Sequence, residues 1–183
     1  YNSIEILSSD PKYKLSQIKA DPFYICPSQK DEYQQACYTN MLPGILRITN
    51  NDLIKGEKYI EKIVGKDSSF KGPIVSDLFH EFIRINLDRP DYNKIEGINL
   101  CHFLADPYRI YCIEGLSGGH MKYGDPNNAY IKGLAFCSTS ELRDDEEDVC
   151  YNSILSRLLI WYSPSKSKDI CKTVPGKFQK YCH

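Results

Sequence analysis

Residues 101–112 read CHFLADPYRIYC, with a cysteine at each end and an Asp-Pro pair in the middle. Pro suits the first turn of a helix and Asp can cap one, so the middle of the segment predicts a turn between two helices. Cysteines at the end of the first helix and the start of the second would face each other across an antiparallel pair, at the separation a disulfide prefers. The segment therefore predicts a helical hairpin closed by one disulfide, with Ser or Asp of the turn capping the second helix in this and similar units.

The same spacing recurs along the chain. Eight cysteines form successive pairs with members 11, 11, 13 and 11 positions apart: Cys26–Cys37, Cys101–Cys112, Cys137–Cys150 and Cys171–Cys182. Between the first two pairs, Val64 and Val75 stand 11 positions apart and mark a unit whose cystine is replaced by an apolar pair. The units then begin 34 to 38 positions apart, a period typical of stacked helical hairpins.

Residues after the second marker of each unit support the repeat. Four positions on stand Met41, Phe79, Leu116 and Ile154, and eight positions on stand Ile45, Ile83, His120 and Leu158. This spacing is one face of a helix, and His120 takes a place that the other units fill with an apolar residue. Pro22 and Pro43 fall within the two helices predicted for the first unit, which makes that unit the least regular.

These patterns predict an all-α fold, a solenoid of about five αα-hairpin repeats, four of which carry an intra-hairpin disulfide. Residues 1–10 are expected to form an N-terminal arm and residues 11–183 a single helical-repeat domain. The predicted units lie near residues 11–50, 51–88, 89–124, 125–163 and 164–183.

Metal binding is the alternative use of the cysteines. Structural zinc needs clustered Cys or Cys/His ligands, whereas Cys101-His102 and Cys182-His183 are adjacent pairs, and no Cys-x-x-Cys-His haem attachment occurs. We therefore expect disulfides, with no metal and no cofactor. Disulfides predict an oxidising compartment, secreted or periplasmic, and we expect that a signal segment is removed before Tyr1.

Composition narrows the range of partners. The formal net charge is −1, which gives no electrostatic basis for a nucleic-acid partner. No apolar run approaches the roughly 20 residues of a membrane span. The expected partner is a protein or peptide.

The repeat period and the cystine in each hairpin resemble the bacterial secreted cysteine-rich Sel1-like repeat proteins, which are relatives of the tetratricopeptide fold. The resemblance covers residues from about 10 to 183, and Gly115, Gly118, Gly119 and Gly133 echo the glycine-rich consensus of that family. It implies an αα-repeat fold that binds protein or peptide on a concave face.

The segment Gly115–His120, GLSGGH, resembles a phosphate-binding loop but lacks the Lys-Ser/Thr ending and falls within a predicted helix. Its small residues favour close approach of two helices, although they could also open a pocket beside His120. A histidine at an apolar position is more often a core residue than a ligand. Both interpretations of His120 remain open. We regard His120, Gly118, Gly119 and Glu114 as possible functional residues.

Other polar motifs have simpler interpretations. His80-Glu81 lacks the second histidine of a metalloprotease motif and is interpreted as a surface pair. The acidic segment 141–148 is interpreted as a solvated turn, with a calcium site or a docking patch as alternatives. The aromatic residues four positions before the second cysteine, Tyr33, Tyr108 and Phe178, are interpreted as packing between repeats.

The sequence favours a protein- or peptide-binding scaffold, or an accessory subunit of a larger assembly, over an enzyme; no catalytic residue is predicted. One alternative is a secreted hydrolase that uses His120 with Glu114 or Glu81. Another is a structural component of an extracellular or envelope complex. The fifth unit reaches only Cys182-His183, so we also expect the C-terminal repeat to pack on a partner or on another copy of the chain.

Overall fold

The computed structural model describes residues 15–182, and all regular secondary structure in that range is helical. The all-α fold is therefore confirmed, and so are all four disulfides, whose Cα atoms lie 5.5–6.1 Å apart. No helix of the described range is long and apolar enough to cross a membrane. The expected N-terminal arm, residues 1–10, lies outside the described residues, and the unit boundaries stay a prediction.

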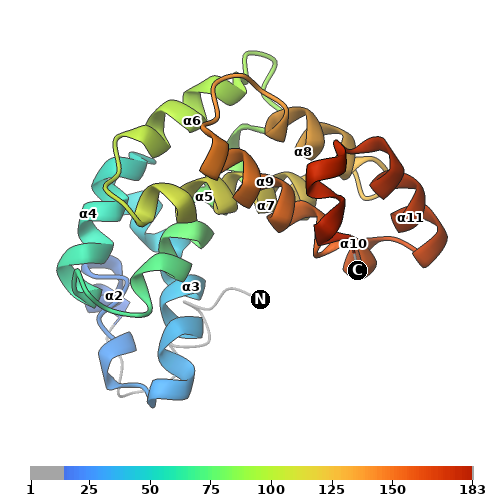
Figure 1. Cartoon of the computed structure of the whole chain (residues 1–183). Helices are drawn as coiled ribbons and strands as arrows, with labels where there is room; N and C mark the ends of the chain where they lie inside the picture. The colour runs from blue at the N-terminus through green and yellow to red at the C-terminus, as the bar shows by residue number, and fades with distance from the viewer. Residues whose placement is uncertain (1–14, 183) are drawn as a thin grey trace.

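The helices follow one another in pairs along the chain (Figure 1). The first members are α2 (Leu15–Ala20) with the 3₁₀ helix η1 (Cys26–Ser28), α4 (Leu53–Val64), α6 (Lys94–His102), α8 (Ala129–Cys137) and α11 (Pro164–Thr173). The second members are α3 (Asp31–Ile48), α5 (Lys71–Asn86), α7 (Tyr108–Tyr123), α9 (Asp144–Leu155) and the 3₁₀ helix η2 (Gly176–Tyr181). A single turn, α10 (Leu158–Trp161), joins the fourth pair to the fifth.

The pairs form an arc with two layers of helices. Helices α3, α5, α7 and α9 pack one against the next and form the inner, concave layer, while α4, α6 and α8 cover them on the outside of the arc (Figure 1). Outer helices pack on inner helices far more than on one another. The outer layer is therefore more open than the inner one.

Burial follows the predicted helix face. The side chains at the four-position and eight-position places of the repeat are all buried, with exposed fractions of 0 to 3%: Met41, Ile45, Phe79, Ile83, Leu116, His120, Ile154 and Leu158. In the unit without a cystine, Val64 ends α4 and Val75 is fully buried in α5. The apolar pair thus occupies the place that the disulfide takes elsewhere.

One local expectation needs correction. Lys30, Phe70 and Pro107 stand at the N-caps of α3, α5 and α7 without a side-chain cap, so the turns do not cap these second helices as expected. Side-chain caps lie instead at first helices of the pairs, where Asp52 accepts from the Lys55 N–H and Asn93 from the Ile95 N–H.

The disulfides stabilise the fold mainly by restricting the conformations of the unfolded chain. Each closes a loop of 11 to 13 positions, for which the chain-entropy model gives about 3 kcal/mol per bridge.

Pro43 lies inside α3 and does not end it, because the helix runs on to Ile48. The first unit is therefore regular in its second helix and irregular only in its first.

Candidate functional site

Helix α7 lies at the centre of the arc and packs against α5, α6, α8 and α9. Its glycine-rich segment faces α5 so closely that a Cβ atom on Gly115 would lie 2.1 Å from the carbonyl oxygen of Ser76. A Cβ atom on Gly119 would lie 2.8 Å from Cβ of Ile83. The segment is a helix–helix contact within α7, as the small residues indicate, and not a phosphate-binding loop.

The structure does not bring the nominated polar residues together. Glu114 and His120 are six positions apart on α7, which places them about 120° apart around the helix. Glu114 pairs with Arg157, whereas His120 lies beside Tyr92 and the ring of Phe136. Glu81 accepts hydrogen bonds from Tyr123 and Arg84, so neither acidic residue is placed to assist His120.

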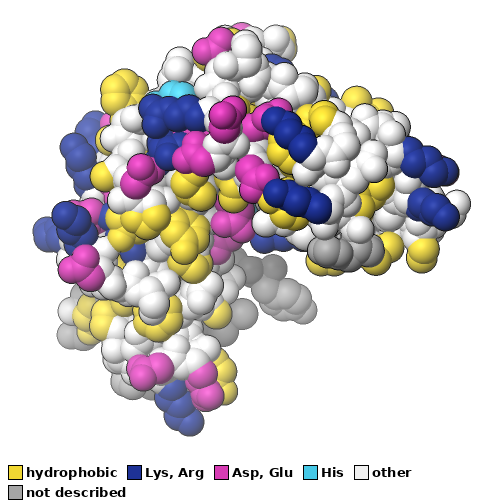
Figure 2. All heavy atoms as spheres, viewed as in Figure 1, with side chains coloured by type: hydrophobic (Ala, Val, Ile, Leu, Met, Phe, Trp, Pro, Cys, Tyr) yellow, Lys and Arg dark blue, Asp and Glu magenta, His cyan; other side chains and the backbone are white. Residues whose placement is uncertain are grey.

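Glu114 instead lines a hollow of about 350 Å³ among the inner-layer helices. The lining comes from α3, α5, α7 and the junction of α9 with α10, and includes Gln35, Asp77, His80, Tyr111, Glu114 and Arg157. We call this hollow the inner groove. It lies on the concave side of the arc, where the outline of the molecule is hollowed in Figure 2.

Hydrogen bonds hold the acidic side chains of the inner groove in place. Asp77 accepts from the Thr39 hydroxyl at 2.7 Å and lies 3.0 Å from Nδ1 of His80. Burial opposes ionisation of Asp77, but the hydrogen bonds from His80 and Thr39 outweigh it and lower the pKa of this carboxyl. Asp77 is therefore a fixed negative charge at neutral pH.

His80 is not placed for proton transfer, although it contacts a carboxylate. Its Nε2 is buried without a hydrogen-bond partner in the described residues, and a Cβ atom on Gly118 would lie 2.5 Å from it. The free ring nitrogen thus packs against the backbone of α7 and does not open into the inner groove. The groove offers fixed hydrogen-bond acceptors and charges, a set suited to holding polar groups.

Sequence reasoning found Glu114 but missed Asp77, Arg157 and Gln35. One signal was present in the repeat, because the position two after each second marker is polar in every unit that continues through its second helix: Thr39, Asp77, Glu114 and Asn152. Asp77 and Glu114 line the groove, and the Thr39 hydroxyl donates to Asp77. Arg157 and Gln35 have no such signal.

A second hollow, of about 400 Å³, lies on the outer side of α7 beside His120. His120 is 3% exposed, and its burial, together with the charges of Lys132 and Lys94, lowers the pKa of the imidazole to about 4. The ring is therefore neutral at neutral pH. A pocket beside His120 was the alternative interpretation of the glycine-rich segment, and the structure has a hollow at this place.

The acidic segment is not a solvated turn, so that interpretation is wrong for its central residues. Glu146 is fully buried and pairs with Arg109 at 2.5 Å and with His102 at 3.0 Å, while Asp145 pairs with Arg109 at 2.6 Å. In Figure 2, acidic side chains gather near α9 with Lys and Arg side chains around them. These contacts join the start of α7 to the start of α9.

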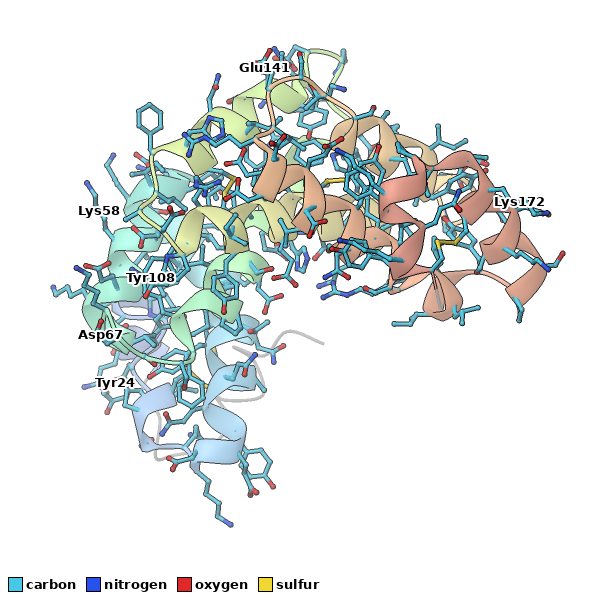
Figure 3. The ribbon with its side chains drawn as sticks, in the orientation of Figure 1. Tyr24, Lys58, Asp67, Tyr108, Glu141 and Lys172 are labelled. Atoms are coloured by element: carbon cyan, nitrogen blue, oxygen red, sulfur yellow. A yellow bond between two sulfur atoms is a disulfide. The ribbon has the colours of Figure 1, made fainter. Side chains whose placement is uncertain are left out.

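The remaining motifs take structural places. The ring of Phe178 stacks on Tyr151 with centroids 4.0 Å apart, and Tyr108, labelled in Figure 3, lies against Lys71 of α5 and donates to the Lys66 carbonyl. Tyr33 is 56% exposed and does not take part in such packing. Within residues 15–182, no group of three or more His, Cys, Asp and Glu side chains is arranged to hold a metal ion.

Comparison with models of known families, with curated proteins and with solved structures gave no match to this chain. The likeness to Sel1-like proteins therefore extends to a cysteine-rich, all-helical fold and no further.

Proposed function

We propose that this chain is an extracytoplasmic binding scaffold that holds a segment of a protein or peptide in the inner groove. One observation carries the proposal: side chains from three successive helical pairs and from the junction of α9 with α10 converge on a single hollow of the concave layer. In repeat proteins the extended concave surface is the usual place of binding, and side chains of several units act there together. Four disulfides indicate an oxidising compartment.

The charges of the inner groove define the partner segment. Asp77 and Glu114 contribute two carboxylates and Arg157 one guanidinium, and Asp77 and Glu114 keep free lone pairs beyond their bonds to Thr39, His80 and Arg157. A Lys or Arg side chain of the partner would donate hydrogen bonds to these free lone pairs. Such complementary charge also fixes the register of the bound segment and excludes other partners. We therefore expect a segment with at least one basic residue.

The test is selection of random peptides, displayed on phage, against the oxidised full chain. The affinity of the recovered peptides is then measured by fluorescence anisotropy. Glu114→Gln removes one of the two groove carboxylates with little change of shape, and Gln35→Trp fills the groove from an exposed position on α3. We expect each variant to weaken binding about tenfold, or about 1.4 kcal/mol.

Glu141→Gln is the matched control, because Glu141 is exposed and lies at the outer edge of the arc, far from the groove (Figure 3). It should bind the selected peptides as the parent chain does. Peptides that lack basic residues, or that bind all three variants equally well, would contradict the proposal.

Self-association through the C-terminal repeat is a second proposal, supported by the exposed side chains of α10. Leu159, Ile160 and Trp161 are 53%, 73% and 46% exposed in consecutive positions, and contiguous exposed apolar residues commonly mark interfaces. Light scattering should give a mass above the 21.1 kDa of one chain, and Ile160→Glu should restore the mass of one chain. Phe103→Glu, at an isolated residue that is 78% exposed, should leave the mass unchanged; a single-chain mass for the parent at high concentration would exclude the contact.

A further inference from the structure

The cavity on the outer side of α7 arises because the outer helices do not pack against one another as the inner helices do. Inner helices pack closely, whereas α6 and α8 cover different parts of α7 and leave a gap of about 400 Å³ between them. The gap is spanned at one edge by Lys94, at the start of α6, which donates to the carbonyl oxygen of Ala135 in α8 at 2.7 Å. Its volume falls in the range of small-molecule sites.

His120 lines this cavity and lacks a full set of partners. The side chain is 3% exposed, its Nε2 lies 3.4 Å from the Tyr92 hydroxyl, and its Nδ1 has no hydrogen-bond partner in the described residues. A buried polar atom without a partner costs free energy unless another group satisfies it. The site is therefore incomplete as the chain alone forms it.

The charged side chains that line the cavity are both lysines. Lys94 and Lys132 both line it, and both depress protonation of His120 through their positive charge. No Asp or Glu side chain is among the residues that line it. Lys94 uses one of its three ammonium hydrogens on Ala135 and keeps two for other acceptors. A negatively charged group is the natural acceptor for these hydrogens.

The walls are apolar and aromatic. Phe136 and Leu87 are buried there, and the rings of Phe136 and Tyr92 lie 5.3 Å and 6.1 Å from that of His120. Aromatic and apolar walls suit a flat aromatic ring, which can pack against them. We propose that the cavity binds a small aromatic carboxylate, with the carboxylate held by Lys94 and Lys132 and the ring packed against the aromatic wall.

This site is separate from the inner groove and does not depend on the proposed function. Glu114 and His120 point to different sides of α7, and the two hollows share no lining residue. His120 contributes its ring to the cavity wall, so a bound aromatic acid would lie beside the imidazole.

The experiment titrates the oxidised full chain with 2-naphthoate by calorimetry and by NMR of the His120 imidazole. We expect saturable binding that shifts the His120 resonances, with 2-naphthamide, the uncharged analogue, bound at least about tenfold more weakly. Lys94→Gln and Lys132→Gln should each weaken naphthoate by a similar factor. Glu114→Gln should leave naphthoate binding unchanged even if it abolishes peptide binding.

Lys172→Gln is the matched control, because Lys172 is exposed at the far end of the arc (Figure 3). Equal affinity for naphthoate and naphthamide, or naphthoate binding that survives Lys94→Gln combined with Lys132→Gln, would overturn the assignment of an anion site. Absence of naphthoate binding up to its solubility limit would overturn the aromatic carboxylate as the ligand class. A thermal melt of each variant verifies that it is folded before either result is accepted.

Discussion

Gly115→Ala is expected to lower the free energy of unfolding by about 3 kcal/mol, the upper part of the usual range for overpacking. In an isolated helix the same change would raise helix stability by about 1 kcal/mol. The difference arises because the added Cβ atom would lie 2.1 Å from the carbonyl oxygen of Ser76, so α5 and α7 would have to separate. Urea denaturation followed by far-UV circular dichroism measures the change.

Gly56→Ala is the matched control, since Gly56 also lies inside a helix. Its added Cβ atom would meet Leu78 at 3.4 Å, an ordinary van der Waals distance. We therefore expect Gly56→Ala to be neutral or to raise stability by up to about 1 kcal/mol. Equal effects of the two substitutions would show that α5 and α7 do not approach as closely as described.

Glu146→Gln is expected to cost about 3 kcal/mol of stability, because it leaves the buried guanidinium of Arg109 without its closest carboxylate partner. Burial opposes ionisation of Glu146, but bonds from the Arg143 N–H, His102 and Arg109 outweigh it and lower the pKa of Glu146 below its ordinary 4.5. The unfolded chain then binds more protons than the folded chain as the pH falls through this range. The stability due to Glu146 is present above the ordinary pKa and is lost as the pH falls through the lowered one.

Chemical denaturation at a series of pH values from neutral to acid measures both effects. Glu146→Gln should lose stability at neutral pH and should show a flatter decline in acid than the parent chain. Glu141→Gln, in the same acidic segment but exposed, should stay within about 0.5 kcal/mol of the parent at every pH. A Glu146→Gln variant as stable as Glu141→Gln would contradict a buried ion pair at this position.

The hairpins and their disulfides could be predicted because they depend on short distances along the chain. Cys101 and Cys112 are joined within 11 positions, and the same interval identified Val64 and Val75 without any cysteine. The apolar face of the second helices followed from a spacing of four. Each of these signals lies within one unit.

The candidate sites could not be predicted in the same way, because they depend on how units lie against one another. Asp77 meets Thr39 across 38 positions, and Arg109 meets Glu146 across 37. The acidic segment was misinterpreted for this reason, since nothing within it shows that Arg109 lies opposite. His120 was noticed as the one polar residue in an apolar column, but its neighbours Tyr92 and Phe136 come from other helices.

The order of cystine pairing bears on how this chain matures. Every cysteine is bonded to the next or the previous cysteine in the sequence, and no bond passes over another. The first cysteine of each pair has its correct partner as the next cysteine along the chain. Each disulfide can therefore form within its own unit, without waiting for distant segments of the chain.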